Sequence, residues 1–196
     1  MGLLGGSFDP AHDGHRHISL EASRRLGLDE VWWLVSPQNP LKKPTESPLE
    51  ERLAAARRIA DHSCIRVTDI ERTMGTVYTI DTLAALTRRF PGIRFVWIIG
   101  ADNLIQIPRW RRWREIFTTV PIAVFARPPY SLKALTGRAA RRFAAFRVSE
   151  TRAGTLVRLR PPAWMFFHTR PHPESATRIR AARDPKQGRR AVTGKP

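Results

Sequence analysis

The sequence has little cysteine and no long apolar run, and each shortage excludes a class of protein. Cys64 is the single cysteine among 196 residues, so an intrachain disulfide and a zinc site built from cysteines are both excluded. It lies in the apolar run CIRVTDI, which predicts a packed thiol in a buried strand rather than a nucleophile. No apolar run approaches the roughly 20 residues that cross a bilayer, and the start lacks the features of a signal peptide. We therefore expect a soluble, cytoplasmic protein.

Acidic residues are also scarce. The formal charge is +17, because 17 Asp and Glu face 34 Lys and Arg. A balance this basic is typical of nucleic-acid-binding proteins, but it also suits an enzyme whose substrates are polyphosphates. The sequence contains no RRM, KH or zinc-finger pattern, so a nucleic-acid-binding module stays an alternative that depends on charge alone.

The chain has the length of about one domain, and neither an internal repeat nor a low-complexity block divides it. We predict a single domain over residues 1–183. Between residues 178 and 196 there are seven basic residues and one acidic residue, and no apolar pattern continues beyond Arg183. This composition predicts a basic, solvated or disordered tail over residues 184–196.

Short apolar runs alternate with segments of helical periodicity along the chain. The runs are β-branched or aromatic and bounded by Gly or Pro, as buried strands are; they cover residues 2–6, 31–37, 64–70, 93–100, 122–128 and 163–169. Helices are predicted over residues 13–26, which Gly27 would end, over 49–60 and over 80–86. The alternation predicts an α/β fold, a Rossmann-like, doubly wound, mostly parallel sheet with helices on both faces. Such sheets bind ligands at the carboxyl ends of their strands.

The first strand end is the segment GLLGGSFDPAHDGH, residues 2–15. Gly5 and Gly6 let the backbone turn tightly after the strand and approach a ligand closely. Neither the G-x-G-x-x-G loop nor the G-x-x-x-x-G-K-[ST] loop is present. Instead, His12 and His15 lie at the start of a predicted helix, where free N–H groups and the positive end of the helix dipole favour a phosphate.

Two other interpretations of these histidines are open. One takes them as incidental surface residues. The other takes them, together with Asp9, as metal ligands. A metal site is disfavoured because H-x-x-H lacks the i, i+4 spacing of a helical zinc pair and no later cluster of ligands completes it. Phosphate contact fits best, because two imidazoles beside a helix N-terminus can both donate hydrogen bonds to an anion.

The opening segment also resembles a known family. GGSFDPAHDGH matches the G-G-x-F-D-P-x-H-x-G-H signature of the nucleotidyltransferases that share the histidine motif of class I aminoacyl-tRNA synthetases. Four further stretches resemble the bacterial nicotinate mononucleotide adenylyltransferases and extend the likeness to about residue 183: WWLVSPQNPLKK (32–43), GTVYTIDTL (75–83), WIIGADNLIQIPRWRRW (97–113) and ESATRIR (174–180). Pantetheine-phosphate adenylyltransferase is the nearest rival, but it typically carries Thr at the position of His12 and does not explain PQNPLK or YTIDT.

The resemblance implies transfer of the adenylyl group of ATP to nicotinate mononucleotide, with Mg²⁺ arriving with ATP. A phosphate oxygen of the mononucleotide would attack the α-phosphorus in line, so neither a general base nor a covalent enzyme intermediate is needed. The products would be nicotinate adenine dinucleotide and pyrophosphate. The resemblance implies catalytic roles for His12, His15 and Arg180, and ATP contacts for Gly5, Gly6, Ser7, Phe8, Gly14, Gly100, Asp102, Ser175, Thr177 and Ile179.

For the mononucleotide, the resemblance implies contacts from Asn39, Lys42, Tyr78, Thr79, Asp102, Trp110 and Arg111. Backbone N–H groups at Tyr78 and Thr79 would hold the nicotinate carboxylate at a helix N-terminus. Trp110 would stack on the pyridine ring.

Structural alternatives stay open for several of these residues. Thr79 and Asp102 each suit the N-cap of a helix. Trp110 and Trp113 lie three apart, which is also the spacing of one buried helix face. Lys42 belongs to a loop lysine pair of the kind that is usually solvated.

Overall fold

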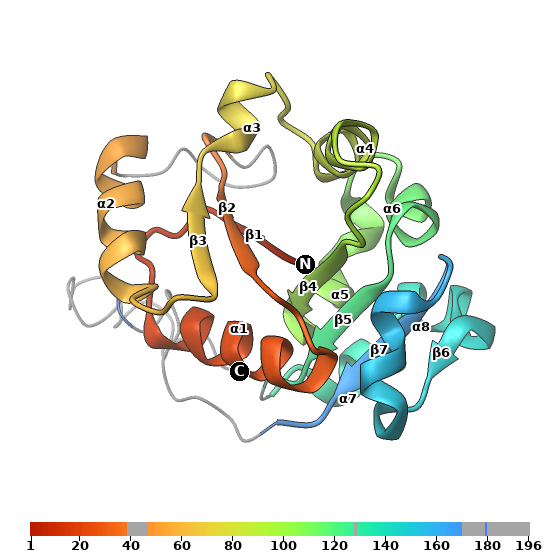
Figure 1. Ribbon diagram of the computed structural model, residues 1–196. Helices are drawn as coiled ribbons and strands as arrows, with labels where there is room; N and C mark the ends of the chain where they lie inside the picture. The colour runs from red at the N-terminus through yellow and green to blue at the C-terminus, as the bar shows by residue number, and fades with distance from the viewer. Residues whose placement is uncertain (39–46, 128, 170–178, 180–196) are drawn as a thin grey trace, which may run out of the picture.

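A seven-stranded sheet forms the centre of the molecule in the computed structural model, which describes residues 1–38, 47–127, 129–169 and 179. The strands are β1 (Gly2–Gly6), β2 (Val31–Val35), β3 (Ile65–Thr68), β4 (Val96–Gly100), β5 (Ile122–Phe125), β6 (Arg147–Val148) and β7 (Trp164–Phe167). Their order is β3-β2-β1-β4-β5-β7-β6, and each pairing of described strands is parallel (Figure 1). The predicted doubly wound α/β fold is confirmed.

All six predicted strands are present, although most are shorter than their apolar runs. The run from 64 to 70 differs from expectation, because β3 lies at the edge of the sheet and its residues are half-buried or exposed. Cys64 precedes β3 and is half-buried, so the prediction of a thiol inside a buried strand is wrong. β6 was not predicted, because a strand of two residues leaves no periodicity in the sequence.

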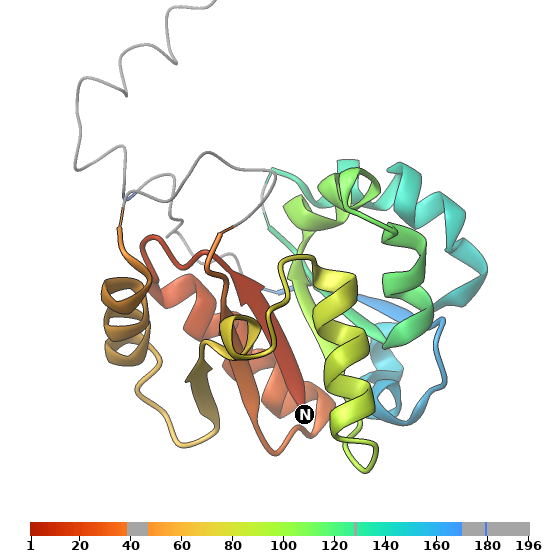
Figure 2. The same cartoon turned by 90° about the horizontal axis from the view of Figure 1, so that it is seen from above.

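Helices cover both faces of the sheet (Figures 1 and 2). One face packs against α1 (Asp13–Leu26), α2 (Leu49–Ile59) and the 3₁₀ segment η3 (Glu150–Arg158). The other packs against α4 (Thr79–Arg89), α5 (Ala101–Gln106), η1 (Ile107–Arg109), α6 (Trp113–Thr119), α7 (Ser131–Leu135) and α8 (Arg138–Arg142). The remaining elements are α3 (Ile70–Thr73) and η2 (Ala144–Phe146). None of the helices that the structure describes is both long and apolar enough to cross a membrane.

Strand β4 illustrates how the sheet separates two apolar cores. Val96 and Ile98 pack with the residues of α1 and α2, whereas Trp97 and Ile99 pack with those of α4 and α6. Successive side chains of a strand point to opposite faces. Because helices cover both faces, the strand is apolar throughout rather than alternating. Each such side chain contributes about 1.5–3 kcal/mol by leaving water.

Helix α1 begins and ends where the sequence indicates. Gly27 follows its last turn with φ 63° and ψ 49°, a left-handed conformation that glycine adopts without a steric penalty. Arg24 and Arg25 lie in the last turn, where positive charge is favoured by the helix dipole. The other two predicted helices are present as α2 and α4.

The winding of the chain reverses at β1, which lies between β2 and β4. The sheet grows from β1 through β2 to β3 on one side and through β4 and β5 on the other. A ligand-binding crevice forms at the carboxyl ends of the strands at such a point. The backbone of β1 approaches β4 closely here, and a Cβ added at Gly5 would overlap the indole of Trp97.

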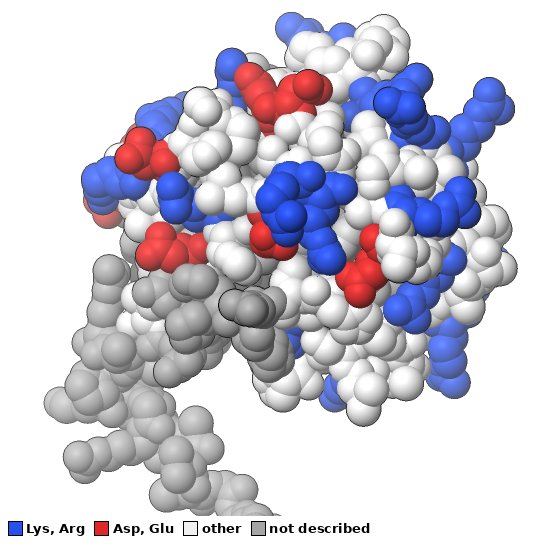
Figure 3. All heavy atoms as spheres, turned by 60° about the horizontal axis from the view of Figure 1, so that its bottom comes forward, with Lys and Arg blue, Asp and Glu red and all other residues white. Residues whose placement is uncertain are grey.

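The basic excess is visible on the surface. Figure 3 shows Lys and Arg side chains spread over one face of the molecule, with fewer Asp and Glu among them. Some of the arginines are paired, as Arg112 is with Glu115 and Arg72 with Glu50. The predicted domain end at residue 183 and the tail over 184–196 lie outside the described residues and stay predictions.

Candidate active site

Two cavities lie side by side at the carboxyl ends of β1 and β4, and Gly5 and Asn103 line both. The smaller has a volume of about 100 Å³ and lies at the start of α1. The larger has a volume of about 480 Å³ and lies at the start of α4. The predicted residues His12, Gly14, His15, Gly100 and Asp102 line the smaller cavity, and Gly6, Ser7, Tyr78, Thr79, Trp110 and Arg111 line the larger.

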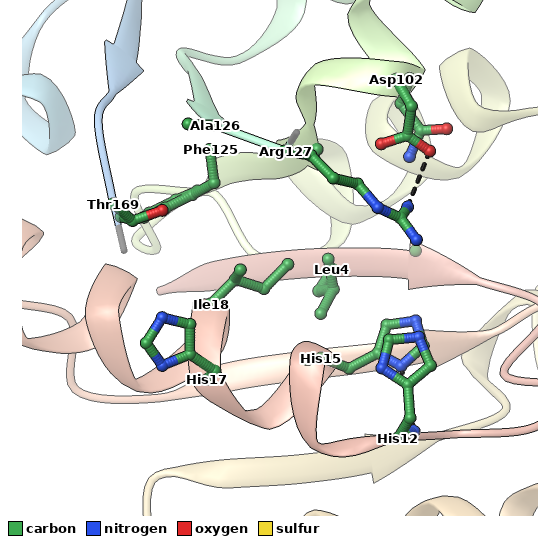
Figure 4. Close-up of a pocket in the computed structure, with 14 residues that line it drawn as sticks. Leu4, His12, His15, His17, Ile18, Asp102, Phe125, Ala126, Arg127 and Thr169 are labelled. Carbon is green, nitrogen blue, oxygen red and sulfur yellow. Dashed lines mark hydrogen bonds and ion pairs between the residues drawn. The ribbon is translucent and has the colours of Figure 1, made fainter. Parts of the chain in front are cut away.

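His12 and His15 stack on one another beside the smaller cavity, with their ring centroids 3.8 Å apart (Figure 4). The backbone N–H of His12 donates to Nδ1 of His15 at 3.3 Å. A neutral His15 ring therefore carries its proton on Nε2, which makes Nε2 a hydrogen-bond donor. Because His12 is only 6% exposed, the interpretation of this residue as an incidental surface histidine is wrong.

The backbone places both rings at the start of α1. His12 is the N-cap residue, with φ −153° and ψ 165°, and His15 lies in the first turn. Phe8, at φ 49°, is 2% exposed; its ring stacks on that of Trp33 at 5.0 Å and lies tilted against that of His15 at 4.7 Å. A left-handed conformation costs a non-glycine residue about 1–2 kcal/mol, and such strain concentrates at functional sites. The Phe8 side chain supports the His15 ring. Phe8 is not among the described residues that line the two cavities, and its ATP contact stays a prediction.

Asp102 and Arg127 form an ion pair at the smaller cavity (Figure 4). Nη1 of Arg127 donates to Oδ2 of Asp102 at 2.9 Å, whereas Oδ1 is buried and has no hydrogen-bond partner among the described residues. The N-cap of α5 is Gly100, so the alternative role of Asp102 as an N-cap is wrong. Over the described part of the chain, no group of three or more His, Cys, Asp or Glu is placed to hold a metal ion.

The larger cavity opens at the N-terminus of α4. Tyr78 is the N-cap residue and Thr79 is the first residue of the helix, so the alternative of Thr79 as N-cap is wrong. The side chain of the N-cap residue, Tyr78, makes no capping hydrogen bond with the described residues. The first N–H groups of a helix have no acceptor within it, and together with the helix dipole they favour an anion.

Trp110 and Trp113 lie in different environments. Trp113 is the first residue of α6, is 8% exposed and packs edge-on against Phe117 in the core. Trp110 follows η1 with an extended backbone and lines the larger cavity. The alternative of one shared helix face is wrong, because a turn separates the two residues. The guanidinium of Arg111 lies 4.7 Å from the centre of the Tyr78 ring at the same cavity.

Two buried polar groups that sequence reasoning missed also line the larger cavity. Glu71 is 6% exposed, and burial raises its pKa from 4.5 to about 7, although hydrogen bonds with Ser36 and Thr82 act in the opposite direction. The Nε1 of Trp97 is buried and has no hydrogen-bond partner among the described residues. Buried polar groups are nearly always hydrogen-bonded, so the indole N–H of Trp97 indicates a polar ligand in this cavity.

Arg52, in α2, is a third residue that sequence reasoning missed. It is 2% exposed, and its guanidinium donates to four backbone carbonyl oxygens, those of Ser7, Ser36, Pro37 and Ser47. Burial lowers the pKa of the guanidinium from its ordinary value. Arg52 therefore holds the loop after β1 against the loop after β2.

Position after a strand is the signal that could have identified Glu71 and Arg127, which follow β3 and β5. Arg52 carries no such signal, because in sequence it looks like a helix surface residue. Of the remaining predicted residues, Asn39, Lys42, Ser175, Thr177 and Arg180 lie outside the described part of the chain. Ile179 is helical and half-buried. The roles assigned to all of these residues stay predictions.

Known proteins resemble this chain over most of its length. Residues 3–182 match the sequence model described as cytidylyltransferase-like. A protein of Cereibacter sphaeroides named probable nicotinate-nucleotide adenylyltransferase is 54% identical over 181 residues, 92% of this chain and 96% of that protein. A protein of the same name from Parvibaculum lavamentivorans is also 54% identical, over 92% of this chain and 90% of its own length.

Solved structures share the fold. The nicotinic acid mononucleotide adenylyltransferase of Plasmodium falciparum, complexed with NaAD, superposes with a TM-score of 0.67 at 16% sequence identity. The alignment covers 91% of this chain and 81% of that one. A second structure of that enzyme, complexed with APC, gives a TM-score of 0.65.

Proposed function

The chain belongs to the cytidylyltransferase-like family and, within it, to the nicotinate-nucleotide adenylyltransferases, and we propose that it transfers the adenylyl group of ATP to nicotinate mononucleotide. The products are nicotinate adenine dinucleotide and pyrophosphate. The observation that carries the proposal is the junction of two chemically different cavities at Gly5 and Asn103. One has stacked histidines at a helix N-terminus and suits a polyphosphate, and the other has an aromatic wall and a second helix N-terminus and suits an aromatic carboxylate.

The mononucleotide occupies the larger cavity in this proposal. Its carboxylate accepts hydrogen bonds from backbone N–H groups at the start of α4, beside Tyr78 and Thr79. Its pyridine ring stacks on Trp110, and Arg111 compensates negative charge. Contacts from Asn39 and Lys42 are proposed from the family resemblance alone.

ATP extends from the same junction toward the histidines. Its phosphates accept hydrogen bonds from His12, from His15 and from the first turn of α1, which contains Gly14. Oδ1 of Asp102, which lacks a donor among the described residues, is suited to accept a ribose hydroxyl. Backbone groups of the glycine turn approach the nucleotide closely, and Ser175, Thr177, Ile179 and Arg180 are proposed to complete the site.

The chemistry is an in-line displacement at the α-phosphorus. The attacking phosphate oxygen is already an anion at neutral pH, so catalysis consists of positioning and of neutralising charge on the phosphoryl group and the departing pyrophosphate. Nε2 of His15 donates toward that charge while its Nδ1 is held by the backbone of His12. His12, buried against the His15 ring, fixes the direction of that donor.

We propose that Mg²⁺ reaches the site bound to the phosphates of ATP and supplies further neutralisation of their charge. Asp102, the carboxylate that lines the histidine cavity, is paired with Arg127, and Mg²⁺ readily keeps water and phosphate oxygens as ligands. A reaction that consumes ATP is also consistent with the cytoplasmic location predicted from the sequence.

The test is pyrophosphate release from ATP across a panel of acceptors. We expect release with nicotinate mononucleotide, less with nicotinamide mononucleotide and none with phosphopantetheine. Equal or faster turnover of nicotinamide mononucleotide would contradict binding of the substrate carboxylate at the N-terminus of α4. Binding to short DNA, measured separately against salt concentration, tests whether the basic surface has a second role, which a steep salt dependence would indicate.

A further inference from the structure

Glu71 is a buried carboxyl group inside the larger cavity to which neither the sequence motifs nor the proposed reaction gives a role. It lies in α3, directly after β3, and is 6% exposed while lining the cavity. Its Oε1 accepts the hydroxyl of Thr82 at 3.2 Å. Its Oε2 is buried and makes no hydrogen bond of normal geometry among the described residues, although the Ser36 hydroxyl lies near enough to the carboxyl group to act on its pKa. Thr82 thus holds one oxygen, and the other keeps room for a hydrogen bond with a ligand.

Thr82 ties this carboxyl group to the start of α4. The Thr82 hydroxyl lies within hydrogen-bond distance of Glu71, of the Thr76 hydroxyl at 2.9 Å and of the carbonyl oxygen of Tyr78 at 3.3 Å. Tyr78 is the N-cap of α4, where the substrate carboxylate is proposed to bind. Glu71 and a bound carboxylate would therefore be close neighbours in this cavity.

The charged groups around the cavity leave Glu71 without an ionic partner among the described residues. Arg109 and Arg111 line the same cavity, together with the titratable ring of Tyr78. Arg111 and Arg112 face Asp81 on α4 at 4.0 and 3.6 Å.

The elements behind Glu71 bring other charges, each already engaged. Asp69, the N-cap residue of α3, pairs with Arg72 of that helix. On the β2 side, Arg52 donates to the carbonyl oxygen of Ser36. Burial is the main influence on Glu71 and raises its pKa to about 7, so both forms of the group are populated near neutral pH.

We propose that Glu71 is a specificity-determining residue, which accommodates the nicotinate carboxylate when it is a neutral acid and disfavours that carboxylate when it is ionised. The inference rests on the proposed function. A neutral acid can donate its proton in a hydrogen bond to the substrate carboxylate, whereas two carboxylates at close range repel each other. The amide of nicotinamide mononucleotide carries no charge and does not experience this repulsion. The preference for acid over amide should therefore fall as pH rises.

The test compares the two mononucleotides between about pH 5.5 and about pH 8.5, on either side of the Glu71 transition. Dissociation constants by calorimetry and kcat/KM by pyrophosphate release are each expressed as a ratio of acid to amide. In this ratio, the titration of the ligand phosphate and of the histidines in the site cancels, because it affects both ligands alike. For the wild-type protein we expect the ratio to fall about tenfold or more with rising pH.

Glu71→Gln supplies the decisive comparison, because an amide N–H mimics the neutral acid and cannot ionise. We expect this variant to keep the high acid-to-amide ratio at every pH, and Glu51→Gln, on the exposed side of α2, to keep the wild-type dependence. A flat wild-type ratio, or the same slope in Glu71→Gln, overturns the inference. So does a ratio that rises with pH, because ionised Glu71 would then favour the acid over the amide.

Binding and turnover separate the inference from the proposed function. If both mononucleotides bind with the expected pH dependence and no pyrophosphate is released, the proposed function fails and the role of Glu71 stands. If pyrophosphate is released and the acid-to-amide binding ratio depends on pH in the same way in Glu71→Gln and wild type, only the inference fails. If neither mononucleotide binds, both fail.

Discussion

Nη1 of Arg52 donates to the carbonyl oxygen of Ser7 at 2.6 Å, across 45 residues of chain. The same guanidinium reaches the carbonyl oxygens of Ser36 at 2.8 Å and Pro37 at 2.9 Å. Ser7 and Ser36 both line the larger cavity. One buried side chain therefore sets the relative position of two loops that border the proposed substrate site.

Replacing Arg52 should damage both stability and activity. Hydrogen bonds to a charged group contribute about 1.5–3 kcal/mol each, so we expect Arg52→Met to lower the free energy of unfolding by about 3 kcal/mol or more. Arg52→Lys keeps the charge but cannot span four carbonyl oxygens, and it should recover only part of kcat/KM. Urea unfolding and steady-state assays measure these effects. Arg57→Met, at an exposed position on the same helix, is the control. Equal losses of stability and activity in the Arg52→Met and Arg57→Met variants would contradict the role of Arg52 in holding the two loops together.

His15 should be required for turnover more than for folding. Removing one preorganised donor typically costs about 10²–10³-fold in kcat, and we expect a loss of at least that size in His15→Ala. The lost cap contact and stacking should cost about 1 kcal/mol of stability. His62→Ala, at an exposed position, should retain full activity. Near-normal turnover of His15→Ala would remove this residue from the mechanism.

Trp110 should act on the mononucleotide and not on ATP. Loss of aromatic stacking costs about 1–3 kcal/mol, so Trp110→Ala should raise KM for nicotinate mononucleotide about tenfold or more, and Trp110→Phe should raise it less. KM for ATP should change little. Trp32→Phe, on β2, serves as the control. Parallel rises in both KM values would indicate a general disturbance of the site instead of a stacking contact.

Gly5 should not tolerate a side chain. Its added Cβ would overlap the Trp97 indole, and overpacking of this kind costs about 1–3 kcal/mol. We expect Gly5→Ala to lose stability and activity, and the double variant with Trp97→Phe, which removes the overlapping atoms, to recover stability. At Gly92 a Cβ meets no atom of the described residues within 4 Å, so Gly92→Ala should be within about 0.5 kcal/mol of wild type. No recovery in the double variant would argue against this steric account.

Glu71 should also make stability depend on pH. Its folded pKa of about 7 lies above its ordinary value of 4.5, so the folded state binds the proton more tightly. The protonated carboxyl group therefore favours the folded state. Its contribution to the free energy of unfolding is fully present below the unfolded pKa and is lost as pH rises through the folded pKa. Glu71→Gln should match wild type near pH 4.5 and exceed it by up to about 3 kcal/mol near pH 8. Unfolding midpoints measured across this range check the prediction, and a difference independent of pH would contradict it.

The sequence predicted the sheet and the phosphate-binding end of α1 because each rests on a local pattern. Buried strands such as β4 are continuous apolar runs, and the glycine and histidine signature lies within fourteen residues, 2–15. Arg52 escaped prediction because its role depends on contacts between residues far apart in the chain. Glu71 and Arg127 were missed although each follows a strand, because position after a strand does not show by itself which side chain enters a cavity. The strand β3 was predicted, but its burial was not, because the burial of a strand depends on which strands lie beside it in the sheet and not on its own sequence.

The place of the site at the junction of β1 and β4 has a consequence for folding. These strands pair directly although about ninety residues separate them in the chain, as Leu3 with Trp97, so the cavities exist only after the two halves of the sheet have docked. Ligands that bind only the docked state draw the equilibrium away from unfolded chains by mass action, by about 2.7 kcal/mol at a concentration one hundred times Kd. The substrates thus help to hold together the two halves that create their site, and thermal unfolding midpoints should rise with each.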